Sequence, residues 1–229
     1  MRRFLNYFSK NELFLWAGSV IFILSSYFIF DRSSLLKLTA SLVGVTSLIF
    51  AAKGNPAGPF LMIVFSILYG IISYSFDYYG EMITYLGMTM PMSVFALISW
   101  LRNSYNGNRS QVAVNRISKV ELLFMALLTA GVTVLFYFIL DYLNTANLFF
   151  STLSVTTSFS AVYLTFRRSP YYALCYSAND GILIILWGLA CMEEISYLSV
   201  VICFVVFLIN DIYGFLNWRK MEQLQKKTV

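Results

Sequence analysis

The stretch from Val120 to Leu140 reads VELLFMALLTAGVTVLFYFIL, and its single charged residue is Glu121. A bilayer core about 30 Å thick is crossed by about 20 apolar residues in a helix, so this stretch predicts a membrane span. Seven more stretches have the same character. They are Leu13–Phe30, Leu35–Ala52, Pro59–Tyr74, Met82–Leu101, Leu148–Phe166, Tyr171–Cys191 and Ile195–Leu216. The sequence therefore predicts an all-α polytopic membrane protein with eight transmembrane helices.

The basic residues predict how these helices sit in the membrane. With a cytoplasmic N-terminus and eight spans, the outer loops hold only Arg32 and Lys37. The cytoplasmic segments hold Arg2, Arg3, Lys10, Lys53, Arg102, Arg109, Arg116, Lys119, Arg167, Arg168, Arg219, Lys220, Lys226 and Lys227. The positive-inside rule requires this asymmetry, so we expect a multi-pass membrane protein with both termini in the cytoplasm.

The composition excludes several function classes. Hydrophobic residues make up 59% of the 229 residues and charged residues 12%, which is unlike a soluble domain. The net charge of +5 fits a collar that faces anionic lipid, so no nucleic-acid partner is needed. Histidine is absent, which removes the commonest metal ligand and general base. We expect neither a cofactor nor enzymatic activity.

The order of features predicts an internal repeat. Lys53-Gly54-Asn55-Pro56 leads into one span and Arg167-Arg168-Ser169-Pro170 into another, and later spans end at Trp100 and Trp218. This order gives one extra span, three spans, a linker span and three spans, with the two triplets parallel as in some transporters. The predicted units are residues 1–34 (N-terminal segment and extra span), 35–101 (first three-helix bundle), 102–143 (loop and linker helix), 144–218 (second bundle) and 219–229 (cytoplasmic tail). Ser118 and Glu121 fit a capping box that starts the linker helix.

Asn179 and Asp180 are the main polar anomaly. They lie about nine residues into the seventh span, roughly 13 Å deep at 1.5 Å per residue. A carboxylate at that depth costs about 2.5–3.5 kcal/mol on insertion scales, so it faces a cavity or a partner. Trp187 shares their helical face. We predict that these three side chains line a substrate site, and interhelical hydrogen bonding is the structural alternative.

Further candidates lie in three other spans. Asn210 and Asp211 repeat the dipeptide in the eighth span, where ligand contact and helix packing are equally open. Tyr85 and Thr89 share one face of the fourth span with Met88 and Met92. Pro91 should kink or loosen that helix. Tyr69 and Tyr74 in the third span could join the same cavity.

Four runs of sequence resemble those of the bacterial PnuC family. They are Ala52–Pro56, Tyr79–Thr89, Ile98–Asn103 and Asn210–Gly214. The resemblance implies an inner-membrane vitamin transporter for nicotinamide riboside, similar in architecture to SWEET sugar transporters. It also implies facilitated diffusion, with a cytosolic kinase that traps the substrate as its phosphate. Related branches carry thiamine or other nucleosides. Asn179 and Trp187 match the family's use of amide and aromatic side chains, whereas Tyr85 departs from relatives with glutamine near that position.

The residues are compatible with such a substrate. Nicotinamide riboside has a cationic aromatic ring, which gains roughly 0.5–2 kcal/mol over an indole. Asn179 could pair with the carboxamide or ribose, and Asp180 could balance the charge. An intramembrane enzyme would need an aspartyl pair such as Asp180 and Asp211 in a Gly-x-Gly-Asp setting, which is missing. A channel would need a charged ring or a filter loop, which is also missing. The sequence leaves open whether the chain forms a homo-oligomer.

Overall fold

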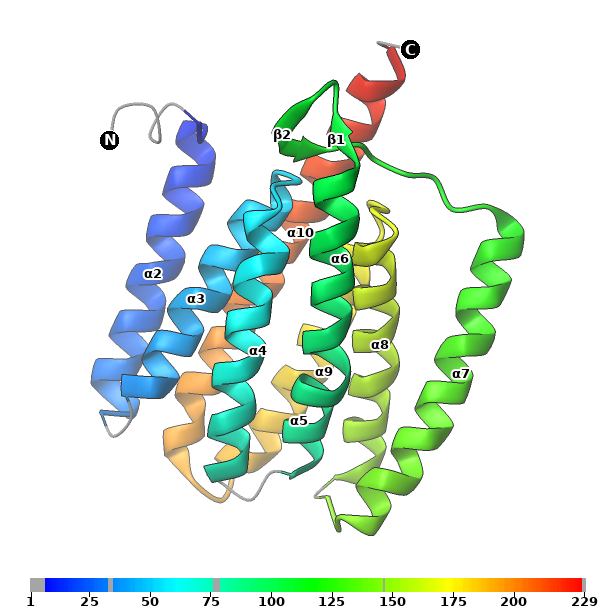
Figure 1. The fold of residues 1–229 in the computed structure, drawn as a ribbon. Coiled ribbons are helices and arrows are strands. Elements are labelled where there is room, and N and C mark those ends of the chain that lie inside the picture. The colour runs from blue at the N-terminus through cyan, green and yellow to red at the C-terminus, as the bar shows by residue number, and fades with distance from the viewer. Residues whose placement is uncertain (1–6, 33–34, 76–78, 146, 228–229) are drawn as a thin grey trace.

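The computed structural model describes residues 7–32, 35–75, 79–145 and 147–227, and in this part eight helices are long and apolar enough to cross a bilayer (Figure 1). Four of these spans are α2 (Lys10–Phe30), α3 (Leu35–Ala52), α4 (Ala57–Ser75) and the continuous run of α5 (Tyr79–Ile83), the π-helix η1 (Thr84–Thr89) and α6 (Met90–Arg102). The others are α7 (Lys119–Tyr142), α8 (Leu148–Phe166), α9 (Tyr172–Cys191) and the 3-10 helix η2 (Ile195–Tyr197) followed by α10 (Leu198–Lys227). The predicted all-α polytopic fold is confirmed.

Six of these helices form a closed ring, which we call the six-helix ring. Around it, α3 packs on α4, α4 on α6, α6 on α8, α8 on α9, α9 on α10, and α10 back on α3. Following the predicted division of the chain, we call α3, α4 and α6 the first bundle and α8, α9 and α10 the second. The contacts of α10 with α3 and of α6 with α8 are therefore the two seams between bundles. The extra helix α2 packs outside against α3 and α10, and the linker helix α7 packs against α8.

The helix ends explain the differences from the predicted spans. Helix α2 begins at Lys10 because Ser9 and Glu12 form a reciprocal capping box. Ser118 caps α7 as predicted, accepting a hydrogen bond from the Glu121 backbone at 3.2 Å. The Glu121 carboxylate does not reach back to the cap, however, because it pairs with Arg167 instead. The ion pair replaces the second half of the predicted box.

The end of the chain that was predicted as a tail is helical. Helix α10 continues through residues 219–227 to Lys227, and Met221 is buried against the Trp100 and Trp218 indoles. The Gln225 amide donates to the Val112 carbonyl at 3.1 Å and accepts from the Val114 backbone at 2.8 Å. These contacts keep the helix wound because they anchor its last turns to the segment after α6.

A β-hairpin lies at the same end of the molecule. Strands β1 (Ser104–Tyr105) and β2 (Asn108–Val112) pair antiparallel. Asn106 and Gly107 form the turn with φ values of 48° and 75°, the backbone that a two-residue hairpin requires. Figure 1 shows that α2 begins, α10 ends and the hairpin lies at one end of the bundle. We call this the hairpin end, and the opposite end the far end.

Candidate functional site

A cavity of about 60 Å³ lies between the two bundles, and we call it the first cavity. Its walls come from α2, α3, α4, α9, η2 and α10. Trp187 and Tyr69 line it, together with Phe65, Phe207 and Cys203. Asp31 and Lys37, which follow α2 and begin α3, stand in its wall as an ion pair with 2.9 Å between Lys37 Nζ and Asp31 Oδ2. These two residues flank the loop between α2 and α3, so this cavity belongs to the far end.

Aromatic side chains form the inner wall of the first cavity. Tyr69 and Tyr85 have ring centroids 4.4 Å apart, and Phe65 contacts both of them. Trp187 packs on Tyr197 with ring centroids 5.4 Å apart and also faces the Tyr69 hydroxyl. Tyr85 does not line the cavity itself but lies directly behind Tyr69. This arrangement offers flat π-faces to an aromatic or cationic ligand.

Asp180 and Asp211 meet inside the six-helix ring. Their side chains, on α9 and α10, interact directly and are 4% exposed each. Asp180 is also an electrostatic neighbour of Tyr85 and of Cys203 in the first cavity wall. Its Oδ2 atom has no hydrogen-bond donor among the described residues. Two buried carboxylates side by side repel each other, so a shared proton, a cation or a donor group placed here would stabilise the pair.

The two asparagines have partners that the sequence did not show. The Asn179 carbonyl oxygen accepts from Ser154 at 3.2 Å and from Thr157 at 3.0 Å, both on α8. The Asn210 amide donates to Ser19 on α2 at 2.9 Å and to the Val206 carbonyl at 2.8 Å. Neither lines the first cavity. Both contribute hydrogen bonds that hold helices together, which is the structural alternative raised for these positions.

The fourth span departs from α-helical geometry at the residues predicted to face the cavity. Thr84–Thr89 form a π-helix, closed by a hydrogen bond from the Met90 backbone to the Tyr85 carbonyl. Pro91 cannot donate a backbone hydrogen bond, so the widened turn lies where the predicted kink was placed. Tyr85, Met88 and Thr89 are all buried, and the Thr89 hydroxyl donates to the Thr84 carbonyl at 3.2 Å. Thr89 is thus occupied within its own helix, and Tyr74 is 62% exposed, outside the cavity.

A second, smaller cavity of about 20 Å³ lies toward the hairpin end. Tyr172 and Tyr176 on α9 line it, with Ser47 on α3 and Met92 and Ser93 on α6. Asp211 is an electrostatic neighbour of both tyrosines. Neither acid lines either cavity, but Asp180 neighbours the wall of the first cavity and Asp211 neighbours two residues that line the second. We call the two cavities and the acidic pair the interior path of the six-helix ring.

Two tryptophans close this path at the hairpin end. The Trp100 indole on α6 donates to the Thr165 carbonyl on α8, and the Trp218 indole on α10 donates to the Ala51 carbonyl on α3, each at 2.8 Å. Both side chains are fully buried, and their ring centroids are 5.3 Å apart. Each bond crosses one seam between the bundles. Sequence analysis used both tryptophans only as evidence for the internal repeat and did not predict a functional role for them. Their matched positions in the two halves were the one sequence feature that could have pointed to such a role.

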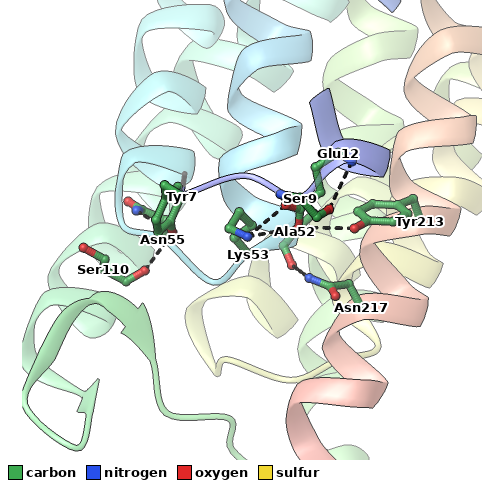
Figure 2. Close-up of polar contacts among 9 residues, drawn as sticks. All are labelled: Tyr7, Ser9, Glu12, Ala52, Lys53, Asn55, Ser110, Tyr213 and Asn217. Carbon is green, nitrogen blue, oxygen red and sulfur yellow. Dashed lines mark hydrogen bonds and ion pairs between the residues drawn. The ribbon is translucent and has the colours of Figure 1, made fainter. Parts of the chain in front are cut away.

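A polar network around Glu12 reinforces the hairpin end (Figure 2). Glu12 is 3% exposed and pairs with Lys53, at 2.9 Å between Nζ and Oε2. Its carboxylate also accepts from the Ser9 backbone at 2.6 Å and from the Tyr213 hydroxyl at 3.2 Å. One carboxylate thus joins α2, the α3–α4 turn and α10. Sequence analysis did not select Glu12, although Ser9-x-x-Glu12 is a capping-box pattern.

The same network reaches the hairpin. Asn55 donates to the Tyr7 hydroxyl at 2.9 Å, and that hydroxyl donates to the Ser110 carbonyl at 3.1 Å. Burial raises the pKa of the Tyr7 phenol, so its hydroxyl remains a donor at neutral pH. Asn217 on α10 donates to the Ala52 carbonyl at 2.8 Å, across the seam with α3. These bonds connect the start of α2, the α3–α4 turn, the hairpin and α10 at the hairpin end.

A ring of membrane-spanning helices around an interior path, closed at one end and hollowed toward the other, defines a multi-pass membrane transport protein. Comparison with known proteins agrees. The family model described as "Nicotinamide mononucleotide transporter" matches residues 34–220. The chain belongs to this family, whose members are transporters and not enzymes.

Individual relatives give the same result. The chain is 25% identical over 226 residues to the nicotinamide riboside transporter PnuC of Neisseria mucosa, covering 93% of this chain and 85% of that protein. It is 22% identical over 190 residues to the PnuC of Haemophilus influenzae, covering 82% and 80%. A crystal structure of the vitamin B3 transporter PnuC superposes with a TM-score of 0.81 at 20% identity, covering 95% of this chain and 94% of that chain. The structural likeness supports the fold.

Proposed function

We propose that this protein carries nicotinamide riboside across the bacterial inner membrane by facilitated diffusion. The observation that carries the proposal is the first cavity, where Trp187 and Tyr69 stand near the buried Asp180–Asp211 pair. A pyridinium ring stacked on the indole gains a cation–π contribution of about 0.5–2 kcal/mol. The acidic pair supplies the counter-charge, and the carboxylate oxygen of Asp180 without a donor can accept from the carboxamide or ribose.

The charge of the path favours the riboside over the mononucleotide that the family description names. A phosphate group is recognised by arginine or lysine. Among the described residues that line the two cavities, Lys37 is the basic one, and it is paired with Asp31. A phosphate moving past Asp180 and Asp211 would meet like charge. A nucleoside cation meets the opposite charge instead.

The cavity volume implies that transport involves movement of the two bundles. Pockets that hold drug-sized ligands measure about 300–1,000 Å³, well above the 60 Å³ of the first cavity. The bundles (residues 35–101 and 144–218 in our division of the chain) must therefore separate at the far end to admit a nucleoside. Separation of the same seams at the hairpin end, where Trp100 and Trp218 lie, would then release it.

We further propose uncoupled transport with both termini in the cytoplasm. A coupled carrier needs an ion or proton site whose occupancy depends on state. The buried intramembrane acids of the path, Asp180 and Asp211, are better used as counter-charge for a cationic substrate. Net accumulation then depends on a cytosolic kinase that phosphorylates the substrate. The hairpin end carries most of the basic residues, so it lies on the cytoplasmic side.

Thiamine is the second candidate, because it also carries a cationic aromatic ring and no phosphate. Calorimetric titration of the purified protein with nicotinamide riboside, nicotinamide mononucleotide, thiamine and adenosine separates these ligands. We expect nicotinamide riboside to bind most tightly and the mononucleotide to bind weakly. Tighter binding of thiamine or of the mononucleotide would replace the proposed substrate.

Uptake into sealed proteoliposomes without a kinase tests the mechanism. We expect saturable entry of nicotinamide riboside that stops when the inside and outside concentrations are equal, with the membrane potential clamped. Accumulation above the outside concentration in a sodium or proton gradient would refute uncoupled transport and make Asp180 a coupling residue.

A further inference from the structure

A large groove lies outside the six-helix ring, at the hairpin end of α7. Its volume is about 570 Å³, far more than either cavity of the path. The described residues that line it come from the segment before α7, from α7, and from α8, the α8–α9 turn, α9 and α10. They are Asn115, Arg116, Ile117, Ser118, Lys119, Leu122, Met125, Leu164, Ser169, Pro170, Tyr171, Leu174, Cys175, Arg219 and Glu222.

The groove is amphipathic along the membrane normal. Its basic residues, Arg116, Lys119 and Arg219, lie at the start of α7 and near the end of α10, where the helices leave the apolar part of the membrane. Its apolar residues, such as Leu122 and Leu174, lie one turn or less inside the spans. Figure 1 shows α7 at the edge of the molecule beside α8. No described residue that lines this groove lines either cavity of the interior path, so the groove is separate from that path.

The groove also carries more positive charge than its own carboxylate can neutralise. Glu222 is 7% exposed and already pairs with Arg116 at 3.2 Å, Arg219 at 2.8 Å and Lys226 at 2.7 Å. Arg219 also lies 5.5 Å from the Tyr171 ring centroid. The lining therefore holds three basic side chains against one carboxylate, and an anion placed here would complete the charge balance.

We propose that this groove binds the phosphate headgroup and upper acyl chains of an anionic phospholipid from the adjacent leaflet. Basic pockets between transmembrane helices on the cytoplasmic side are suited to such headgroups. The phosphate meets Arg116, Lys119 and Arg219, and the acyl chains pack on Leu122, Met125 and Leu174. A lipid held there joins the linker helix α7 to α9 and α10, with which α7 shares few contacts of its own.

The test is lipid binding by delipidated protein in neutral detergent, measured by native mass spectrometry. The probes are phosphatidylglycerol, phosphatidylcholine and glycerol 3-phosphate. Each basic residue near a membrane surface contributes about 1 kcal/mol to anionic lipid binding, which is about fivefold in affinity. We expect Lys119→Gln to weaken phosphatidylglycerol binding about fivefold, and Arg116→Gln with Lys119→Gln to weaken it about 25-fold.

Two further variants complete the design. Arg102→Gln with Arg109→Gln removes two exposed basic residues from the same end but outside the groove, and it should leave binding unchanged. Leu174→Glu should abolish binding, because it places a carboxylate among the acyl chains. All of these side chains are half-buried or exposed, and a thermal melt confirms that each variant folds.

Three results would overturn the proposal. Equal affinity for phosphatidylcholine would remove the role of the headgroup charge. Binding of glycerol 3-phosphate as tight as that of the lipid would indicate a site for free phosphate. A change of oligomeric mass in Leu174→Glu, without lipid binding by the parent, would show that a second copy of this chain occupies the groove.

Discussion

Replacing either seam tryptophan by phenylalanine should open the hairpin end. Trp218→Phe removes the hydrogen bond to the Ala51 carbonyl, and Trp100→Phe removes the one to Thr165. Neither carbonyl is left without a partner, since Ala51 also accepts from the Gly54 backbone at 2.8 Å, and Thr165 likewise keeps a backbone donor. The cost is therefore that of one ordinary hydrogen bond, about 1 kcal/mol, and not that of an orphaned buried group.

This cost falls on one conformation. The two bonds cross the seams, so they exist only while the hairpin end is closed. A loss of about 1 kcal/mol shifts the equilibrium about fivefold toward the conformation that is open at this end. The double variant should shift it by less than the product of the single effects, because the two indoles are in contact and their energies are coupled.

Labelling of an introduced cysteine measures the shift. Ser93 lines the second cavity and is 4% exposed, so Ser93→Cys reports access to the path from the hairpin end. The background chain carries alanine at Cys175, Cys191 and Cys203. In inside-out vesicles, a membrane-impermeant maleimide should label the introduced thiol about fivefold faster when Trp218 is replaced.

Trp16→Phe is the matched control. Its indole also donates one hydrogen bond, to the Thr46 hydroxyl at 3.2 Å, but this bond joins α2 to α3 and crosses no seam between bundles. Labelling in the control should match the parent. Unchanged labelling in Trp100→Phe and Trp218→Phe, or an equal rise in the control, would refute the view that these tryptophans hold the closed end.

Three more predictions concern the network, the cavity and the topology. Glu12→Gln should lower the free energy of unfolding in detergent by about 2–4 kcal/mol, because a buried ion pair loses one partner. Glu121→Gln should lower it by only about 1 kcal/mol, because the pair with Arg167 is more exposed. Equal losses of stability in thermal melts would contradict this difference. Trp187→Ala should weaken binding of nicotinamide riboside by about 1–3 kcal/mol in calorimetry, and unchanged affinity would place the substrate elsewhere. Reporter fusions at Lys227 and within the Arg102–Lys119 loop should both be cytoplasmic, and a periplasmic result at either position would overturn the span count.

The sequence was sufficient to predict the membrane-spanning helices, because the length of an apolar stretch and the charges that flank it are local properties of the chain. The spans Leu35–Ala52 and Leu148–Phe166 have the predicted bounds at both ends. The eighth span was extended by long-range contacts: Gln225 bonds the chain at Val112 and Val114, more than a hundred residues away. No local sequence pattern predicts such long-range contacts, so the last helical turns of α10 were predicted as a tail.

The interior of the path was harder to predict for a related reason. Their depth in the membrane and their polarity identified Asn179, Asp180 and Asn210 as candidate site residues. These two properties do not predict the direction in which the two amide side chains point. Asn179 is held by Ser154 and Thr157, and Asn210 points outward to α2. Residues one position apart on a helix differ by about 100° in direction. The acids next to these amides therefore contact each other across α9 and α10, while the amides bond neighbouring helices.

The two halves are alike at the hairpin end. Ala51 and Thr165 are both acceptors for a seam tryptophan. Three residues later, Gly54 and Arg168 both have positive φ, at 65° and 57°. Each half also begins with a capped helix whose glutamate pairs with a basic residue in the turn after the second helix: Glu12 on α2 pairs with Lys53 after α3, and Glu121 on α7 pairs with Arg167 after α8. These matched features agree with the predicted order of one helix plus three, taken twice, which stays a prediction.

The halves differ where the substrate is proposed to bind. When Pro56 is aligned with Pro170, Asn179-Asp180 in the second half falls on Phe65-Ser66 in the first. Phe65 lines the first cavity, and Ser66 is fully buried with its hydroxyl bonded to the Met62 carbonyl. A ligand with a cationic ring at one end and a ribose at the other has no symmetry to match. In the proposed mechanism, matched seams let the two bundles move alike, while an aromatic wall opposite an acidic pair gives that ligand a single orientation during the movement.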